Sequence, residues 1–158
     1  MGIDPGLNIT GYGLINISDS DNPQLSGHGY IRTNSRQSLA DRLKKIYSEL
    51  FTLIQYNKPD IVAIENIFYA ENVKTAIVMG HARGAAIVAA VNNEIDVKEY
   101  SPREIKMSVV GNGAAGKMQV RYMVANLLGI REEIEPDDAS DALAVALCHW
   151  HRSNKVLV

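Results

Sequence analysis

Apolar and polar positions along the first third of the chain alternate in the manner of β-strands. A very short apolar segment ends at Asp4. In residues 9–17 and 25–33 apolar and polar positions alternate, and clusters of Asp, Asn, Pro and Gly bound both segments. The last two segments predict a hairpin. Further on, residues 60–65 (DIVAIE) are β-branched and apolar on both faces, as is typical of a strand inside a sheet. Residues 96–100 predict another short strand.

The segments between and after these strands have the spacing of helices. Apolar residues recur every three or four positions over residues 38–56, where Ser38 or Asp41 is available as the cap. Ser101 followed by Pro102 is a typical helix start, and this helix stops at a glycine. Further helices are expected over residues 72–91, 117–128 and 137–152. Strands followed by alternating strands and helices predict an α/β fold with a mixed, five-stranded sheet flanked by helices.

Length and composition restrict the class of protein. The 158 residues contain no repeat or linker, which predicts a single domain over residues 1–158. No apolar run reaches the roughly 18 residues of a membrane helix, and the start of the chain has no basic region followed by an apolar one. A single cysteine, Cys148, excludes an intrachain disulfide. We therefore expect a cytoplasmic protein with no membrane partner.

Charge is unevenly distributed although the formal net charge is only −2. Residues 101–131 contain five Lys or Arg against one acid, whereas residues 132–141 contain six acids and no base. This arrangement fits two neighbouring solvated faces, or a channel for a polyanion that leads to bound cations. The sequence pattern alone leaves both interpretations open.

Four carboxylates occupy positions where a soluble core rarely accepts charge. Asp4 ends the first strand, and Glu65 ends the apolar run of residues 60–65. Asp138 and Asp141 are three residues apart, so they share one face of an otherwise apolar helix. If the two strands are parallel neighbours, Asp4 and Glu65 emerge together at the carboxyl edge of the sheet, where ligands bind in α/β proteins.

Converging carboxylates raise one another's pKa or bind divalent cations. Oxygen ligands without His or Cys favour Mg²⁺ or Mn²⁺, and two such ions about 4 Å apart suit in-line hydrolysis of a phosphodiester. Individually, Asp138 could cap its helix, Asp141 could favour the helix dipole, and Asp4 could begin a turn. These alternatives leave Glu65 unexplained, so the metal cluster is the better hypothesis.

Two other motifs bear on nucleic acids. The segment GNGAAGKM, residues 111–118, has the glycine and lysine spacing of a phosphate-binding P-loop, but Met118 replaces the Ser or Thr that contacts Mg²⁺ and no strand precedes it. We therefore expect no NTPase site, although Lys117 could meet a DNA phosphate. Phe68 and Tyr69 follow Glu65 and either stack on an unpaired base or simply pack.

The motifs together resemble one family over nearly the whole chain. They are GIDPGLNITGYG (2–13), AIENIFYAEN (63–72), GHARG (80–84), YSPREIK (100–106) and PDDASDALAVA (136–146). Their order and spacing resemble the RuvC family of Holliday junction resolvases. This resemblance implies a ribonuclease H-like fold and a homodimer that resolves four-way DNA junctions with Mg²⁺, two ions per active site, with Mn²⁺ as a substitute.

The resemblance also implies roles for individual residues. The catalytic and metal-binding quartet falls on the four carboxylates named above, Asp4, Glu65, Asp138 and Asp141. The catalytically important, DNA-contacting lysines match Lys106 and Lys117, and the aromatic residue that disrupts or stacks on bases matches Phe68. The implied partners are a four-way junction and the RuvA and RuvB branch-migration machinery.

We therefore expect an endonuclease that cuts two junction strands symmetrically in recombination and repair, leaving 5′-phosphate and 3′-hydroxyl ends. Residues 72–91, with Gly80 and Gly84, are expected at the dimer interface. Three other functions stay open: an actin-like nucleotide-binding module, which normally needs two such domains; a junction binder without catalysis; and a relative that processes ribosomal RNA precursors.

The sequence departs from the family at one point. Relatives usually have further apolar residues before GIDPG, whereas here Met1, Gly2 and Ile3 precede Asp4. Either the start codon is misassigned, or the chain is trimmed, or the central strand is short and Asp4 is less rigidly held; we expect that a lengthened first strand raises stability and activity.

Overall fold

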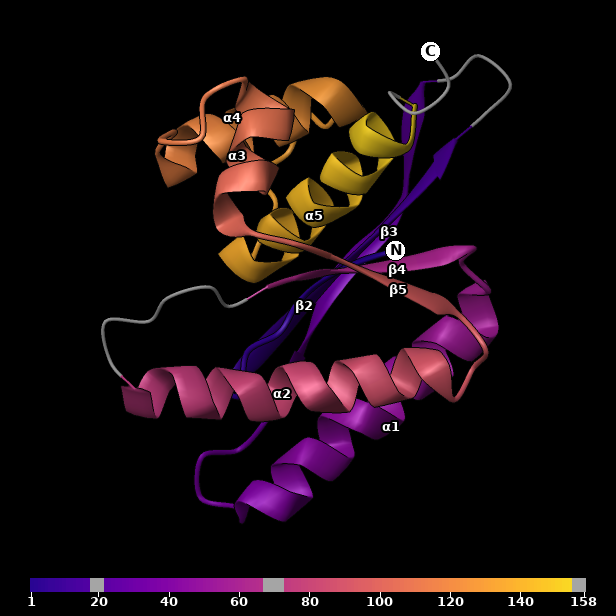
Figure 1. Cartoon of the computed structure of the whole chain (residues 1–158), viewed down its shortest axis with the longest axis vertical. Helices are drawn as coiled ribbons and strands as arrows, with labels where there is room; N and C mark the ends of the chain where they lie inside the picture. Colours follow the sequence, from indigo (N-terminus) through magenta and orange to yellow (C-terminus); the bar gives the residue numbers. More distant parts are fainter. Residues whose placement is uncertain (18–21, 67–72, 155–158) are drawn as a thin grey trace.

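The computed structural model describes residues 1–17, 22–66 and 73–154. One sheet separates two helical layers: α1 and α2 cover one face, and α3, α4 and α5 lie on the other (Figure 1). None of the helices in these ranges has the length and apolarity needed to cross a membrane. The elements in chain order are β1 (Gly2–Asp4), β2 (Ile9–Ile17), β3 (Pro23–Arg32), α1 (Leu39–Asn57), β4 (Ile61–Glu65), α2 (Val73–Val91), β5 (Asp96–Tyr100), α3 (Pro102–Val110), α4 (Lys117–Leu128) and α5 (Asp137–Asn154).

The sheet has the strand order β3-β2-β1-β4-β5 and is mixed, as predicted. β2 is antiparallel to both β1 and β3, while β4 is parallel to β1 and β5. The central strand β1 has three residues, in agreement with the expectation of a short strand. Backbone hydrogen bonds from the Met1 amino group to Ile61 and from the Ala63 amide to Met1 extend its pairing with β4.

The helix starts follow the caps read from the sequence. Ser38 is the N-cap of α1, since its hydroxyl accepts a hydrogen bond from the Asp41 amide at 3.1 Å. Ser101 and Glu104 form a reciprocal capping box at the start of α3. The α3 helix ends at Gly111, which adopts the left-handed conformation that glycine tolerates best. Local sequence therefore specifies these boundaries.

Alternation along the strands divides the core in two. Ile3, Val62 and Ile64 face α1 and α2, whereas Ala63 packs against α5. The predicted burial of α5 is confirmed, because its middle is almost completely enclosed: Ala139, Ser140, Ala142, Leu143, Ala144, Val145, Ala146, Leu147 and Cys148.

Glycines on β1 and β2 allow α5 to approach the sheet backbone. A Cβ atom at Gly2 would lie 2.1 Å from the carbonyl oxygen of Ala142, and one at Gly11 would lie 1.9 Å from that of Asp138. Gly13 also faces α5, where a Cβ atom would lie 2.6 Å from the side chain of Leu143. Gly2 and Gly13 are strand partners and Gly11 lies two residues along β2, so all three glycines are on one face of the sheet. They form a seat for the helix and set its height above the sheet.

We predict that Gly11→Ala lowers the free energy of unfolding by about 3 kcal/mol, because the new methyl group must displace the backbone of the first turn of α5. The matched control is Gly27→Ala on β3, where a Cβ atom would meet only a Leu14 methyl carbon at 3.7 Å. Urea unfolding of both variants tests this. Equal stability of the two variants would contradict the close-approach argument.

Candidate active site

The two central parallel strands bring Asp4 and Glu65 together. The register pairs Ile3 with Ile64, so the next residue of each strand emerges at the same carboxyl edge. A side-chain hydrogen bond from Asp4 to Glu65 joins the two carboxyl groups. The parallel arrangement posited from the sequence is therefore confirmed.

The first turn of α5 adds the other two carboxylates from above the sheet. Asp138 packs by its backbone over Gly11, which is the strand partner of Asp4. Asp141 follows three residues later and lines the same cavity as Asp4 and Glu65. Both α5 carboxylates act electrostatically on Asp4. The structure thus brings Asp4, Glu65 and Asp141 to one cavity, with Asp138 close enough to act electrostatically on Asp4; these four residues are termed the carboxylate cluster.

A buried arginine holds the loop that follows Asp4. Arg42 of α1 donates from Nη2 to the Leu7 carbonyl at 3.1 Å and to Asn8 Oδ1 at 2.5 Å, and from Nε to Thr33 Oγ1 at 2.8 Å. The Thr33 hydroxyl in turn donates to the Leu7 carbonyl. These bonds anchor the backbone immediately after Asp4 to both β3 and α1. Sequence analysis missed this role of Arg42, because its partners are distant in the chain.

Burial and mutual repulsion dominate the electrostatics of Asp4. Burial raises the pKa of its carboxyl group to about 8, and the charges of Glu65, Asp141 and Asp138 add to the increase, while Lys117 opposes it. A carboxyl group of this kind holds a proton at neutral pH unless cations compensate its charge.

The same causes act on the neighbouring carboxylates. Burial raises the pKa of Glu65, with a contribution from Asp141, and Lys117 and Lys106 counteract it. Burial also raises the pKa of Asp141 against the effect of Lys117. Lys117 Nζ lies 3.6 Å from Asp141 Oδ2 and its side chain is 74% exposed. Both predicted lysines therefore surround the cluster as partial counter-charges.

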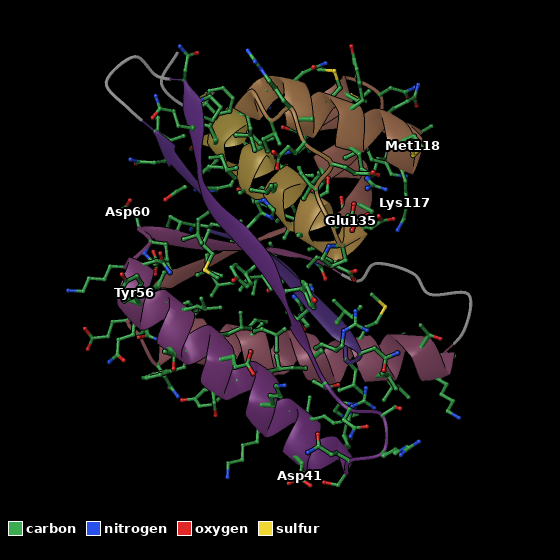
Figure 2. The ribbon with its side chains drawn as sticks, turned by 180° about the vertical axis from the view of Figure 1, so that it is seen from behind. Asp41, Tyr56, Asp60, Lys117, Met118 and Glu135 are labelled. Atoms are coloured by element: carbon green, nitrogen blue, oxygen red, sulfur yellow. The ribbon has the colours of Figure 1, made fainter. Side chains whose placement is uncertain are left out.

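Two adjoining cavities give access to the carboxylates. The inner one, about 310 Å³, is lined by Asp4, Glu65, Asp141 and the two lysines at positions 106 and 117. The outer one, about 780 Å³, opens between β3 and the start of α5 and shares Lys117 and Asp141 with the inner cavity. Figure 2 shows Lys117 and Glu135, which also line the outer cavity, on the same side of the molecule.

The acidic residues before α5 and in its first turns differ in their contacts. Arg121 of α4 pairs with Glu133 at 3.2 Å and with Asp137 at 2.7 Å. Asp138 and Asp141 belong instead to the carboxylate cluster. Exposed ion pairs therefore account for part of the charge pattern, as the interpretation of solvated faces predicts, and Asp137 also lines the outer cavity. The polyanion channel stays a prediction.

The remaining sequence candidates have different outcomes. The glycine-rich segment joins two helices, α3 and α4, and follows no strand, which agrees with the exclusion of a P-loop. Cys148 is fully buried, and burial raises the pKa of its thiol to about 11, which makes it unreactive. The stacking prediction for Phe68 and Tyr69 lies outside the described residues.

The donor set fits a hard divalent cation. In the described ranges, no three acidic, His or Cys side chains are grouped closely enough to hold a metal ion together. Mg²⁺ does not require such a group, because it retains several waters and binds through one or two carboxylates. The buried Asp4 carboxyl, with its raised pKa and oxygen-only neighbours, is the arrangement that such an ion would compensate.

We predict that the contribution of Asp4 to the free energy of unfolding in EDTA falls as the pH rises from about 4 to about 8. In this range folded Asp4 retains a proton that the unfolded chain has released, so the folded state loses its advantage with rising pH. Asp4→Asn should weaken this dependence and exceed the wild type in stability at pH 8. Urea unfolding at pH 5 and pH 8 tests it, with the exposed Asp96→Asn as the control. An unchanged pH slope in Asp4→Asn would contradict the prediction.

Sequence comparisons support the geometry. A family model described as Crossover junction endodeoxyribonuclease RuvC matches residues 1–149. The protein of that name from Alkaliphilus oremlandii is 47% identical over 154 residues, covering 98% of this chain and 93% of the relative. The one from Tolumonas auensis is 48% identical over 157 residues, covering 99% of this chain and 89% of the relative.

Solved structures agree with the sequence comparisons. Thermus thermophilus RuvC in complex with a Holliday junction substrate superposes with a TM-score of 0.92 at 30% identity, covering 98% of this chain and 94% of that one. A yeast mitochondrial Holliday junction resolvase, with a TM-score of 0.68 and 14% identity, shares the fold. The expected ribonuclease H-like fold is confirmed. The chain belongs to the RuvC family of crossover junction endodeoxyribonucleases.

Proposed function

We propose that this protein resolves four-way DNA junctions by metal-dependent hydrolysis of one phosphodiester in each of two strands. The observation that carries the proposal is the convergence of Asp4, Glu65, Asp138 and Asp141 at the carboxyl end of the central strands. Family membership supports it, since a RuvC relative forms a complex with a Holliday junction substrate. The products would carry 5′-phosphate and 3′-hydroxyl ends that can be ligated.

The four carboxylates would hold Mg²⁺, with two ions per site and Mn²⁺ as a substitute. Bound there, the ions would supply an activated water and a counter-charge for the leaving oxygen. The chain itself fixes the ligands: strand pairing sets Asp4 beside Glu65, and the glycine seat of α5 sets the height of Asp138 and Asp141. A rigid frame of this kind positions the reacting phosphate.

Lys117 and Lys106 would bind phosphate oxygens and stabilise charge in the transition state. Lys117 begins α4, is largely exposed, and reaches Asp141 across the cavity, so its Nζ lies where a DNA phosphate would approach the cluster. Lys106 of α3 is half-buried and lines the inner cavity. The role of Phe68 at the junction centre stays a prediction.

A homodimer across α2 supports symmetric cutting. Exposed apolar residues line one side of this helix and form an apolar stripe: Val73, Ile77, Val88 and Val91. Gly80 and Gly84 continue the stripe, and a Cβ atom at either glycine would contact nothing within 4 Å. Since no described part of the chain covers this stripe, a second copy packed along it would bury apolar surface and pair two active sites.

The remaining partner predictions follow from family membership. RuvA and RuvB stay the predicted branch-migration partners, and the single nuclease domain over residues 1–158 stays the predicted organisation. An actin-like nucleotide module and ribosomal RNA processing receive no support from the comparisons with RuvC proteins.

We predict that Asp141→Asn abolishes cleavage in Mg²⁺ while junction binding is retained, because this carboxylate would hold the ions. The matched control is Asp137→Asn on the same helix turn, which removes an ion pair with Arg121 and leaves the quartet intact. End-labelled four-way junction, linear duplex and single strand are incubated in Mg²⁺ or EDTA and resolved on a denaturing gel. Paired nicks on the junction alone, absent in EDTA, are expected for the wild type and the control. Junction binding without any cutting by the wild type would instead favour a binding protein without catalysis.

We also predict that Ile77→Glu separates the dimer, because a charge in the apolar stripe would be buried without a partner. Tyr56→Glu, at an 86% exposed position of α1, introduces the same charge elsewhere and should leave the dimer intact. Sedimentation analysis measures the mass of each variant. A dimeric Ile77→Glu variant would place the interface on another surface.

A further inference from the structure

Two exposed side chains of β3 face the carboxylate cluster across the outer cavity. Tyr30 and Arg32 are two residues apart on the strand and lie on the α5 side of the sheet, because Ile31 between them is buried on the opposite side. Across the cavity are Asp138 and Asp141. The sequence analysis gave neither residue a role, since their position beside the cluster depends on strand pairing.

Strand register places Tyr30 in line with the catalytic cluster. Tyr30 pairs with Gly11, and Gly11 pairs on its other side with Asp4. Tyr30 is therefore two strand spacings, about 10 Å, from Asp4. This distance corresponds to a few nucleotides along a DNA strand. The intervening position, Gly11, has no side chain and is covered by the backbone of Asp138, so Tyr30 and Asp4 lie on either side of the start of α5.

Arg32 is held in place but has no carboxylate partner among the residues that the structure describes. Its guanidinium carbon lies 5.5 Å from the centre of the Tyr30 ring, in a cation–π arrangement. The next residue, Thr33, is buried and bonded to the Leu7 carbonyl and to Arg42, so the end of β3 is fixed to the loop that follows Asp4.

The charges around the outer cavity make Arg32 available to an anion. Lys117 pairs with Asp141 on the facing wall. The acidic residues of that wall form no ion pair with Arg32 among the described contacts, although the guanidinium is exposed. A DNA strand entering between β3 and α5 would meet repulsive carboxylates on one side and this guanidinium on the other.

We propose that Tyr30 and Arg32 form a strand-holding subsite, in which Arg32 binds a backbone phosphate of the cleaved DNA strand and the Tyr30 ring lies against the neighbouring sugar or base. The inference rests on the proposed function, because the ligand is the strand that enters the carboxylate cluster. The subsite fixes the strand a few nucleotides from the cut. Guanidinium groups suit this task because their fork of N–H donors matches phosphate oxygens.

Junction binding tests the phosphate contact directly. Arg32→Gln is made in the Asp141→Asn background, so that affinity is measured in Mg²⁺ without cutting. The expected result is about fivefold weaker binding. The slope of log affinity against log salt concentration should also become shallower, by the amount expected for about one phosphate contact. Lys44→Gln removes the same charge from the exposed side of α1, on the other face of the sheet, and should change neither quantity.

Neutral methylphosphonates placed one at a time along the cleaved strand locate the contact. A methylphosphonate at one position should weaken binding by the protein that retains Arg32. The same methylphosphonate should not weaken binding by Arg32→Gln any further. Arg32→Lys should recover part of the affinity, and Tyr30→Phe should bind normally while Tyr30→Ala binds more weakly. Thermal unfolding confirms that each variant is folded.

The outcomes separate this inference from the proposed function. Failure of the unsubstituted protein to cut the junction overturns the proposed function. Normal cutting together with an Arg32→Gln affinity equal to that of Lys44→Gln overturns the subsite alone. An Arg32→Gln variant that remains sensitive to the same methylphosphonate position also overturns it, because Arg32 would then serve only to protect the edge of the sheet.

Discussion

The close packing of α5 on glycines of the sheet is the constraint on which the rest of the site depends. Gly2 and Gly11 let the helix backbone reach the strands without intervening side chains. The first turn of α5 consequently lies beside Asp4, and its own carboxylates join those of β1 and β4. A thicker side chain on β2 would raise the helix and separate the two halves of the cluster.

The cluster is electrostatically costly to the folded protein. Burial and repulsion raise the pKa of Asp4, Glu65 and Asp141, and the surrounding lysines only partly compensate. Local hydrogen bonds hold the carboxylates in position despite this cost, and the clearest example is the Arg42 network in the loop after Asp4. Divalent ions that bind these preorganised carboxylates would then stabilise the folded protein and offset this cost.

Local signals in the sequence determined most of the fold. Alternation identified β2 and the hairpin, Ser38 and Ser101 marked two helix starts, and the apolar run ending at Glu65 identified a buried strand. Each of these signals acts between neighbours in the chain, through hydrogen bonds of caps or the period of the backbone. The four carboxylates were identifiable because charge in an apolar context is itself a local anomaly.

Tertiary structure alone decided which distant residues became neighbours. Arg42 holds the loop beside Asp4, Arg121 separates the exposed acids from the cluster, and Tyr30 and Arg32 reach the outer cavity. None of these contacts has a sequence period, because they join elements through strand order and helix packing. The sequence by itself thus determined the elements and the unusual carboxylates. The convergence of these carboxylates, and the basic and aromatic side chains around them, depended on how the strands paired and how closely α5 packed.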